Sequence, residues 1–345
     1  LLKTFLPLIS IDFIDFLKLN TTCNIKSIYF SRLESLIMTN KFIDIYKNSI
    51  EKPEEFWQKN SEDIFWFKKP TKILNKSNHP FYKWYEDGVT NTCYNALDVH
   101  IDNGNGDKIA LIYDSPITGY KSKHTYKDLR DKVSKFAGAL KNYGIKKGDR
   151  IIIYMPMIPE AVIAMLACGR IGAIHSVVFG GFASNELASR IDDSKAKILI
   201  TASCGFEPSR TVEYKPLVDG ALKLAKHKIE KVIFFQRKGN EVKLNTPFEI
   251  SWEEALSNGK STDCVEMNSN DYAYILYTSG TTGIPKGIVR DIGGHIVALK
   301  WTMKNIYNIE ENDIWWSASD IGWIVGHSYI VYAPLFKGCT TVLFE

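Results

Sequence analysis

The 345-residue chain lacks an excess of charge of either sign, with 43 Lys and Arg against 39 Asp and Glu. Basic residues are interspersed with acidic ones, so no basic stripe indicates nucleic acid binding. Long apolar runs are also absent. A membrane helix needs about 18 apolar residues, and even residues 1–19 are interrupted by Lys3, Asp12, Asp15 and Lys18. We therefore expect small-molecule substrates, no nucleic acid partner and no membrane partner.

Cysteine is sparse, and its six residues are widely spaced. Without a Cys-x-x-Cys pair the sequence indicates no zinc or redox motif, and we predict no metal ligands and free thiols in a reducing compartment. Cys204 follows a predicted strand, but a lone cysteine without an identified base is more often structural than catalytic. The acidic residues near the start argue against a targeting peptide. We predict a cytoplasmic location, with the mitochondrial matrix as the alternative if residues 1–37 are a presequence.

The ends of the sequence look abrupt. The chain does not begin with Met, and Met38 stands just before a segment of ordinary protein character. We expect residues 1–37 to be a non-native extension or a presequence, and residues 38–100 to be an aromatic-rich segment that wraps the core. Residues 101–345 would form an incomplete α/β domain that ends in a predicted strand, 339–345. The sequence thus predicts a fragment cut at both ends.

Short apolar runs alternate with amphipathic stretches between about residues 108 and 235, as in a parallel sheet covered by helices. Thr125 is placed to cap a helix that ends at Gly144, and Pro159 to open the next helix. Predicted strands cover residues 150–155, 173–179, 197–201 and 231–235, and further helices cover 184–191 and 217–228. The favoured fold is α/β, with doubly wound, mostly parallel sheets and flanking helices.

A glycine-rich and hydroxyl-rich loop follows the predicted strand 271–277. Its sequence, T-S-G-T-T-G-I-P-K-G over residues 278–287, combines three kinds of phosphate-binding group. Glycines allow the backbone N–H groups to approach an anion, hydroxyls donate hydrogen bonds, and one lysine supplies charge. We predict a phosphate site formed by Thr278, Ser279, Gly280, Thr281, Thr282, Gly283 and Lys286, with Lys286 as the catalytic residue.

Two other phosphate motifs are excluded at this loop. A Walker loop needs Gly-Lys followed by Ser or Thr, whereas Lys286 follows Pro285 and precedes Gly287. A dinucleotide-binding Gly-x-Gly-x-x-Gly turn is absent as well, which makes a nicotinamide-dependent dehydrogenase a weak alternative. A turn of the same composition without any ligand stays open.

At these residues the sequence resembles the adenylate-forming superfamily, whose signature loop is Y-T-S-G-T-T-G-x-P-K-G. Further stretches are similar to the short-chain acyl-CoA synthetases, namely N-T-C-Y-N-A-L-D (91–98), H-S-V-V-F-G-G-F (175–182) and R-I-D-D (190–193). The segments A-S-C-G-F-E-P-S-R (202–210), I-V-R-D-I-G-G-H (288–295) and G-W-I-V-G-H-S-Y (322–329) look closer to propionate-CoA ligases than to acetate-CoA ligases. The resemblance covers about residues 42–345.

The resemblance implies an acid-thiol ligase that uses ATP, Mg²⁺ and coenzyme A. A short carboxylic acid attacks the α-phosphate of ATP, and coenzyme A then displaces AMP. It places Glu207, Pro208, Ser209 and Arg210 at coenzyme A, with Arg210 as the phosphate partner. It places Trp323, Ile324, Val325 and His327 at the acyl group. Val325 stands where acetate enzymes tend to carry Thr, which favours propionate. For His327, a purely structural role is as well supported as a role at the acyl group.

Two interpretations follow for the activity. The first is a propionate-CoA or similar short-chain ligase, and acetate is the alternative acid. The second is an incomplete, catalytically inactive nucleotide-binding fragment, because the resemblance places the adenine, ribose and magnesium contacts and a lysine-bearing lid domain beyond Glu345. We expect this fragment alone not to form acyl-adenylate. We also predict a helix over residues 292–307, with Ile296, Leu299, Met303 and Ile306 on its apolar face. The tryptophans Trp315 and Trp316, next to the acyl segment, are expected in the core.

Overall fold

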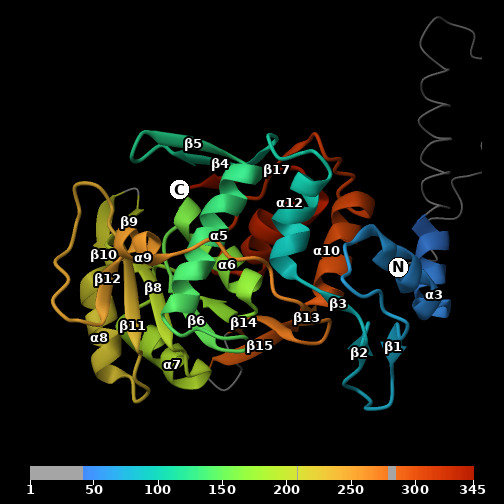
Figure 1. The fold of residues 1–345 in the computed structure, drawn as a ribbon, viewed down its shortest axis with the longest axis horizontal. Helices are drawn as coiled ribbons and strands as arrows, with labels where there is room; N and C mark the ends of the chain where they lie inside the picture. Colours follow the sequence, from blue (N-terminus) through green and yellow to red (C-terminus); the bar gives the residue numbers. More distant parts are fainter. Residues whose placement is uncertain (1–41, 208, 279–284) are drawn as a thin grey trace, which may run out of the picture. The chain divides into compact units, whose positions relative to one another are not determined.

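The computed structural model describes residues 42–207, 209–278 and 285–345. Contacts divide the chain into two compact units, with the boundary between Trp57 and Gln58. In the first unit residues 42–51 are helical, and helix α3 (Pro53–Asn60) begins there and crosses the boundary. The second unit holds both larger sheets, which are visible in Figure 1.

A seven-stranded sheet forms the centre of the second unit, in the order β12-β11-β8-β6-β7-β14-β15. Six strands run parallel, and β15 pairs antiparallel with β14 at the edge. The strands are β6 (Arg150–Tyr154), β7 (Ile174–Val177), β8 (Ile198–Ala202), β11 (Lys231–Phe235), β12 (Glu249–Ser251), β14 (Tyr272–Thr278) and β15 (Lys286–Asp291). Strands β6 and β8 are almost wholly buried, because helices cover the sheet.

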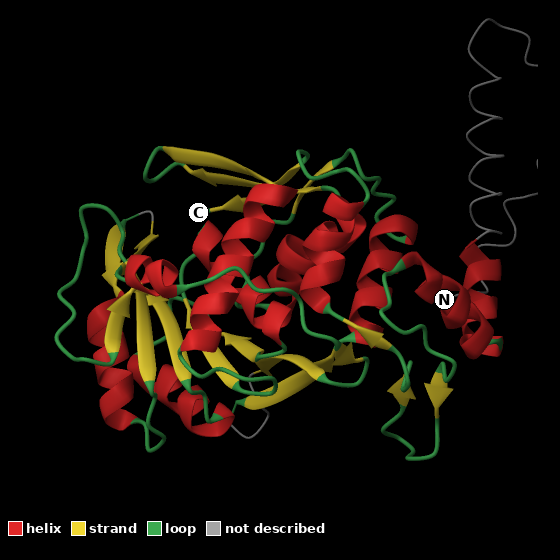
Figure 2. Ribbon diagram, viewed as in Figure 1, coloured by secondary structure: helices red, strands yellow, loops and turns green. Residues whose placement is uncertain are grey.

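The order of the strands reverses beside β6. The chain passes from β6 to β7 on one side and then crosses back to β8 on the other. Right-handed crossovers therefore place α6 (Pro159–Ile171) and α7 (Ser184–Ser194) on opposite faces of the sheet. Helix α5 (Tyr126–Asn142) packs on α6 and on α9 (Trp252–Asn258), and α8 (Tyr214–Leu224) packs on α7. Figure 2 shows helices on both faces, and the doubly wound prediction is confirmed.

Local sequence signals account for the ends of these helices. The Thr125 side chain accepts a hydrogen bond from the Asp128 N–H, and the Asp128 carboxylate accepts one from the Thr125 N–H, which is a capping box. Pro159 stands at the first turn of α6, and Gly172 ends this helix with a φ of 72°. Both predicted starts are confirmed. The predicted helix 217–228 is displaced, since α8 begins at Tyr214 and ends at Leu224.

A second sheet of four strands has the order β16-β17-β4-β5. Its strands are β4 (Ile109–Ser115), β5 (Tyr120–Thr125), β16 (Ile314–Trp316) and β17 (Thr340–Phe344). Strand β17 lies parallel between β16 and β4. Helix α10 (Gly293–Asn305) connects β15 of the first sheet to β16 of the second, and the π-helix η3 (His327–Tyr332) and helix α12 (Ala333–Lys337) lie between β16 and β17.

The remaining elements are short. Three two-stranded pairs are β1 (Leu74–Asn75) with β2 (Lys83–Trp84), β3 (Val89–Thr90) with β13 (Met267–Asn268), and β9 (Cys204–Glu207) with β10 (Arg210–Glu213). The short helices are η1 (Ser61–Asp63), η2 (Tyr94–Asp98), α4 (Val99–Asp102) and α11 (Ile324–Gly326). Among the described residues, none of the helices has the length and apolar character to cross a membrane.

Two core predictions are wrong at the ends of elements. Trp316, expected in the core, is 58% exposed, because it lies on the edge strand β16. On α10 the apolar face predicted from Ile296, Leu299 and Met303 is buried, but Ile306 is 58% exposed since the helix ends at Asn305. The apolar periodicity of the sequence therefore continues past the last residue of the helix.

A buried ion pair joins α6 to η2 in the second unit. The guanidinium of Arg170, in the last turn of α6, donates to both carboxylate oxygens of Asp98 at 2.7 and 2.9 Å. Both side chains are nearly inaccessible, with exposed fractions of 3% and 10%. A buried charge left alone is far costlier than the pair, because nothing replaces the water it has lost.

We predict that Asp98→Ala lowers the free energy of unfolding by about 3–5 kcal/mol, because it leaves the Arg170 charge buried without a counterion. Urea denaturation followed by circular dichroism measures the change. Lys121→Ala is the matched control, since it breaks the exposed pair with Asp114 and should cost less than about 1 kcal/mol. Equal losses in the two variants would contradict the prediction.

Candidate functional site

A pocket of about 290 Å³ opens where the order of the parallel strands reverses. Open α/β sheets bind ligands at this kind of position, outside the carboxyl ends of the strands. Pro156 and Met157 follow β6, Phe179 and Gly180 follow β7, and Gly205 lies in β9 just after β8. The end of the second sheet closes the pocket with Phe344 and Glu345.

Carboxylates dominate the polar lining of this pocket, which includes Glu207, Asp320 and Glu345. Glu345 is neutralised by Arg237, which donates to both of its oxygens at 2.7 and 2.8 Å. Burial raises the pKa of Asp320, while the Gly322 N–H donates to its Oδ1 at 2.7 Å and opposes that rise. The pocket is therefore less negative than its composition suggests.

The predicted coenzyme A residues lie on the β9–β10 hairpin. Glu207 and Arg210 face each other across the hairpin and form an ion pair of 2.8 Å. Glu207 also lines the pocket, and Arg210 and Ser209 are exposed beside it. This ion pair lowers the pKa of Glu207 and raises that of Arg210. Pro208 lies outside the described residues.

The predicted phosphate loop connects the antiparallel strands β14 and β15. Thr278, the last residue of β14, pairs with Lys286, the first residue of β15, and both are exposed. Ser279, Gly280, Thr281, Thr282 and Gly283 lie outside the described residues. The two ends of the loop are therefore held at one strand spacing.

A row of aromatic rings and one arginine joins this hairpin to the predicted acyl segment. The Tyr277 hydroxyl donates to Asp193 at 2.6 Å, and the Arg190 guanidinium lies 5.3 Å from the Tyr277 ring. Arg190 also lies 4.8 Å from the Phe182 ring, and Phe182 meets Trp323 at 6.1 Å between ring centroids. Such cation–π contacts are attractive at these distances. Arg190 of α7 is thus linked to Tyr277 on β14 and, through Phe182, to Trp323.

The acyl segment begins a helix. Trp323 is the N-terminal flanking residue of α11, and Ile324 and Val325 lie in its single turn. All three side chains are about half exposed, at 49%, 50% and 51%. Trp323 packs on Phe179, whose ring centroid is 5.7 Å away and which lines the pocket. Glu207 and Phe179 line the pocket, whereas Trp323, Ile324 and Val325 do not, and the acyl segment reaches the pocket only through the contact of Trp323 with Phe179.

His327 differs from these residues because it is fully buried. Its Nδ1 lies 3.2 Å from the Ile321 carbonyl oxygen, and its Nε2 lies 3.1 Å from Nε2 of His175. A carbonyl only accepts, so Nδ1 of His327 carries the proton and its Nε2 accepts from His175. Tyr332 also contacts His175, at 3.2 Å. His327 therefore belongs to a buried histidine–tyrosine cluster below the acyl segment.

Burial keeps this cluster neutral. It lowers the pKa of His327 to about 3 from an ordinary value of 6.5, and it lowers the pKa values of His175 and His295 well below 6.5. The unfolded chain therefore binds more protons than the folded chain below about pH 6.5. The stability linked to these histidines is complete above that pH and is lost as the pH falls toward 3.

We predict that His327→Asn reduces the dependence of unfolding free energy on pH between about 6.5 and 3, by up to one proton. Asparagine can still donate to the Ile321 carbonyl but does not titrate. Urea denaturation across this pH range measures the slope. Tyr332→Phe is the control, because it alters the cluster without removing a histidine. A slope equal to that of the wild type in His327→Asn would refute the prediction.

The sequence interpretation missed several residues of the pocket. Phe179, Gly180 and Gly181 line it, and so does Tyr214 from the start of α8. A Cβ on Gly180 would lie 2.1 Å from the Tyr214 hydroxyl, so a larger residue at this position would displace the Tyr214 ring. The Gly180-Gly181 pair directly after a buried strand is the sequence signal that could have indicated the pocket.

Comparison with known proteins places these features in a family. The family model described as "AMP-binding enzyme" matches residues 99–345, and one described as "Acetyl-coenzyme A synthetase N-terminus" matches residues 43–96. The chain is 54% identical over 298 residues to "Acyl-CoA synthetase short-chain family member 3, mitochondrial" from Bos taurus, covering 86% of this chain and 43% of that protein. The Homo sapiens protein of the same name gives the same values.

More distant relatives agree. "Acetyl-coenzyme A synthetase" of Xylella fastidiosa (strain Temecula1) is 46% identical over 309 residues, covering 87% of this chain and 47% of that protein. The solved "Acetoacetyl-CoA Synthetase from Streptomyces lividans" superposes with a TM-score of 0.79 at 23% identity, covering 87% of this chain and 45% of that one. At that identity the likeness shows the fold alone. The chain spans less than half the length of these relatives.

Proposed function

Because the chain belongs to the AMP-binding enzyme family, we propose that its protein activates a short carboxylic acid with ATP and transfers the acyl group to coenzyme A. The observation that carries this proposal is the β14–β15 hairpin, where Thr278 and Lys286 are paired and exposed at the two ends of the glycine-rich loop. The names of the curated relatives, which are acyl-CoA and acetyl-CoA synthetases, support the same activity.

The chemistry of the proposed first step needs positive charge at the phosphates more than it needs a nucleophilic side chain. Carboxylate attacks the α-phosphate of magnesium ATP, pyrophosphate leaves, and an acyl-adenylate forms. Lys286 would balance charge on the phosphates, and Thr278 with the loop residues Ser279, Gly280, Thr281, Thr282 and Gly283 would donate hydrogen bonds. No described residue is proposed as a covalent intermediate.

The second substrate, coenzyme A, is proposed to bind at the pocket beside the β9–β10 hairpin. Arg210 is exposed and would bind a phosphate group of coenzyme A, with Ser209 in the turn next to it. Glu207 already pairs with Arg210 at 2.8 Å, so an incoming phosphate has to compete with that carboxylate. Pro208 is proposed to shape the same turn.

We further propose propionate as the preferred acid, with acetate as the alternative. The half-exposed side chains of Trp323, Ile324 and Val325 offer an apolar surface next to Phe179. Val325 offers a methyl group where a threonine would offer a hydroxyl, and an added methylene on the acid gains from that contact. His327 is proposed to support this surface from below rather than to touch the acid.

The location and the domain division are proposed as well. The relatives from Bos taurus and Homo sapiens are named as mitochondrial, which favours the mitochondrial matrix over the cytoplasm.

The two family models match residues 43–96 and 99–345, and this supports a division near residue 100 into a wrapping segment and an AMP-binding domain.

Binding of ATP tests the proposed function directly. We predict that Lys286→Ala weakens the binding of magnesium ATP to the purified chain by about 10- to 100-fold, because one charged contact worth about 1.5–3 kcal/mol is lost. Isothermal titration calorimetry measures the affinity. Lys223→Ala, on the exposed side of α8, removes the same charge elsewhere and should leave the affinity unchanged. A wild-type chain that binds no ATP, or equal affinities for all three, would overturn the proposal.

The acid preference has its own test. We predict that Val325→Thr lowers the ratio of propionate to acetate affinity, because a methylene against an apolar wall is worth about 1–3 kcal/mol. Quenching of tryptophan fluorescence by each acid, with ATP present, reports binding, since Trp323 adjoins residue 325. Val289→Thr, on the exposed strand β15, is the control. An unchanged ratio in Val325→Thr would favour an acid site elsewhere.

A further inference from the structure

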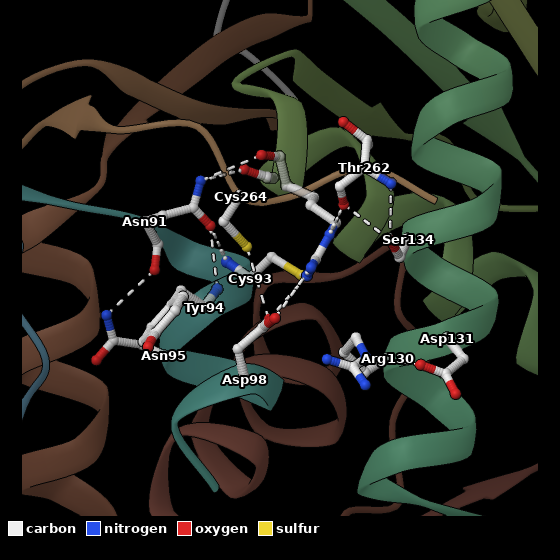
Figure 3. A network of polar contacts seen from close by, with 12 residues as sticks. Asn91, Cys93, Tyr94, Asn95, Asp98, Arg130, Asp131, Ser134, Thr262 and Cys264 are labelled. Carbon is white, nitrogen blue, oxygen red and sulfur yellow. Dashed lines mark hydrogen bonds and ion pairs between the residues drawn. The ribbon is translucent and has the colours of Figure 1, made fainter. Parts of the chain in front are cut away.

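Two cysteines meet outside the proposed substrate sites. Cys93 and Cys264 are remote in sequence, yet their Sγ atoms and a carboxylate oxygen of Asp98 all lie within 4.8 Å of one another. Figure 3 shows the two sulfurs side by side above Asp98. Cys93 is fully buried, whereas Cys264 is only partly buried. Cys264 is therefore the more exposed residue of the pair.

The side chain of Asn91 fixes the backbone on both sides of this pair. Its Oδ1 accepts from the Cys93 N–H at 2.8 Å, and its Nδ2 donates to the Val265 carbonyl oxygen at 2.9 Å. The Val265 N–H in turn donates to the Arg170 carbonyl oxygen at 2.9 Å. A single amide thus holds the segments of both cysteines, and the two thiols are kept opposite each other.

The charges around the pair differ for the two sulfurs. Nη1 of Arg170 lies 3.5 Å from Sγ of Cys93, while Sγ of Cys264 donates to Oδ2 of Asp98 at 3.6 Å. Both oxygens of Asp98 already accept from the Arg170 guanidinium, and that positive charge disfavours a metal cation in the same place. The chemistry that remains is that of a dithiol.

We propose that Cys93 and Cys264 form a dithiol modification site, which a small disulfide compound such as oxidised glutathione converts into an intramolecular disulfide. The Cys264 thiolate attacks one sulfur of the small disulfide, and the first small thiol leaves. The Cys93 thiolate then attacks Sγ of Cys264, and the second small thiol leaves. The two protein thiols are oxidised, the small disulfide is reduced, and both protons end on the released thiols.

The bond would change the network that surrounds it. The sulfurs have to approach to about 2.05 Å, which withdraws Cys264 from Asp98. The linked segment continues into β13 and then β14, so the bond would tie the start of η2 to the chain that leads into the Thr278–Lys286 hairpin. Burial, the neighbouring Cys93 thiol and Asp98 raise the pKa of Cys264. Exchange should consequently be slow at neutral pH and faster as the pH rises.

Peptide mapping of the oxidised chain tests the proposal. The folded chain is incubated with oxidised glutathione at neutral and at mildly alkaline pH, alkylated, and digested without reduction. We expect one crosslinked peptide that joins Cys93 to Cys264, a loss of two of the six thiols and a mass lower by two hydrogens. The crosslink should form faster at the higher pH. Loss of thiols without this crosslink would overturn the proposal.

Single substitutions separate the two steps. In Cys93→Ser the second step is blocked, so a stable mixed disulfide of Cys264 with glutathione should accumulate. In Cys264→Ser the remaining buried thiol should not react. Cys168→Ala is the matched control, because it removes a buried cysteine of α6 and should leave the crosslink intact. Equal oxidation of the wild type and Cys264→Ser would also overturn the proposal, and circular dichroism confirms that each variant is folded.

Discussion

The buried ion pair of Arg170 and Asp98 is the interaction on which the arrangement of the site depends. Besides its two bonds to Asp98, the guanidinium donates to the Thr262 carbonyl oxygen at 2.6 Å. It therefore joins α6, η2 and the connection before β13, which are remote in sequence. The buried guanidinium restricts the geometry of its partners, because the loss of any one of them would leave the desolvation of the charge uncompensated. The other end of α6 starts just after Pro156 and Met157, so the pair fixes the helix that directly follows two residues of the pocket.

Two ion pairs balance charge at the pocket, and they differ in their exposure. Glu345 and Arg237 are 4% and 8% exposed and form a closed, bidentate pair. Glu207 and Arg210 are 40% and 69% exposed, and water screens their attraction strongly. An anionic substrate would thus meet one arginine that is locked in place and one that can exchange its partner. Of these two arginines, Arg210 is the one that could exchange its carboxylate for a phosphate, and its position at the turn of the hairpin follows from the short β9–β10 pairing.

Local sequence signals predicted the fold well wherever a helix or strand is determined by its own residues. Thr125 and Pro159 begin α5 and α6 as predicted, and β11 spans residues 231–235 as predicted. Contacts between remote segments were not predictable. Nothing in the sequence pairs Asp98 with Arg170 or Cys93 with Cys264, because each pair forms only when separate elements pack. The prediction of Trp316 in the core was wrong for the same reason, since the burial of this side chain depends on which strands lie beside β16. The predicted roles of the site residues stay predictions.

Strand β14 holds the residue at which the predicted phosphate loop begins. Tyr274 and Tyr277 are three residues apart on a strand, so their side chains point to opposite faces of the sheet. Tyr274 packs against His327, with 4.3 Å between ring centroids, and Tyr277 is held by Asp193 and Arg190. The strand is consequently clamped on one face by the neutral histidine cluster and on the other by α7. Thr278 directly follows Tyr277, so the predicted phosphate loop begins at a fixed strand end. The conformational entropy of that strand end is lost on folding and does not have to be lost on ligand binding.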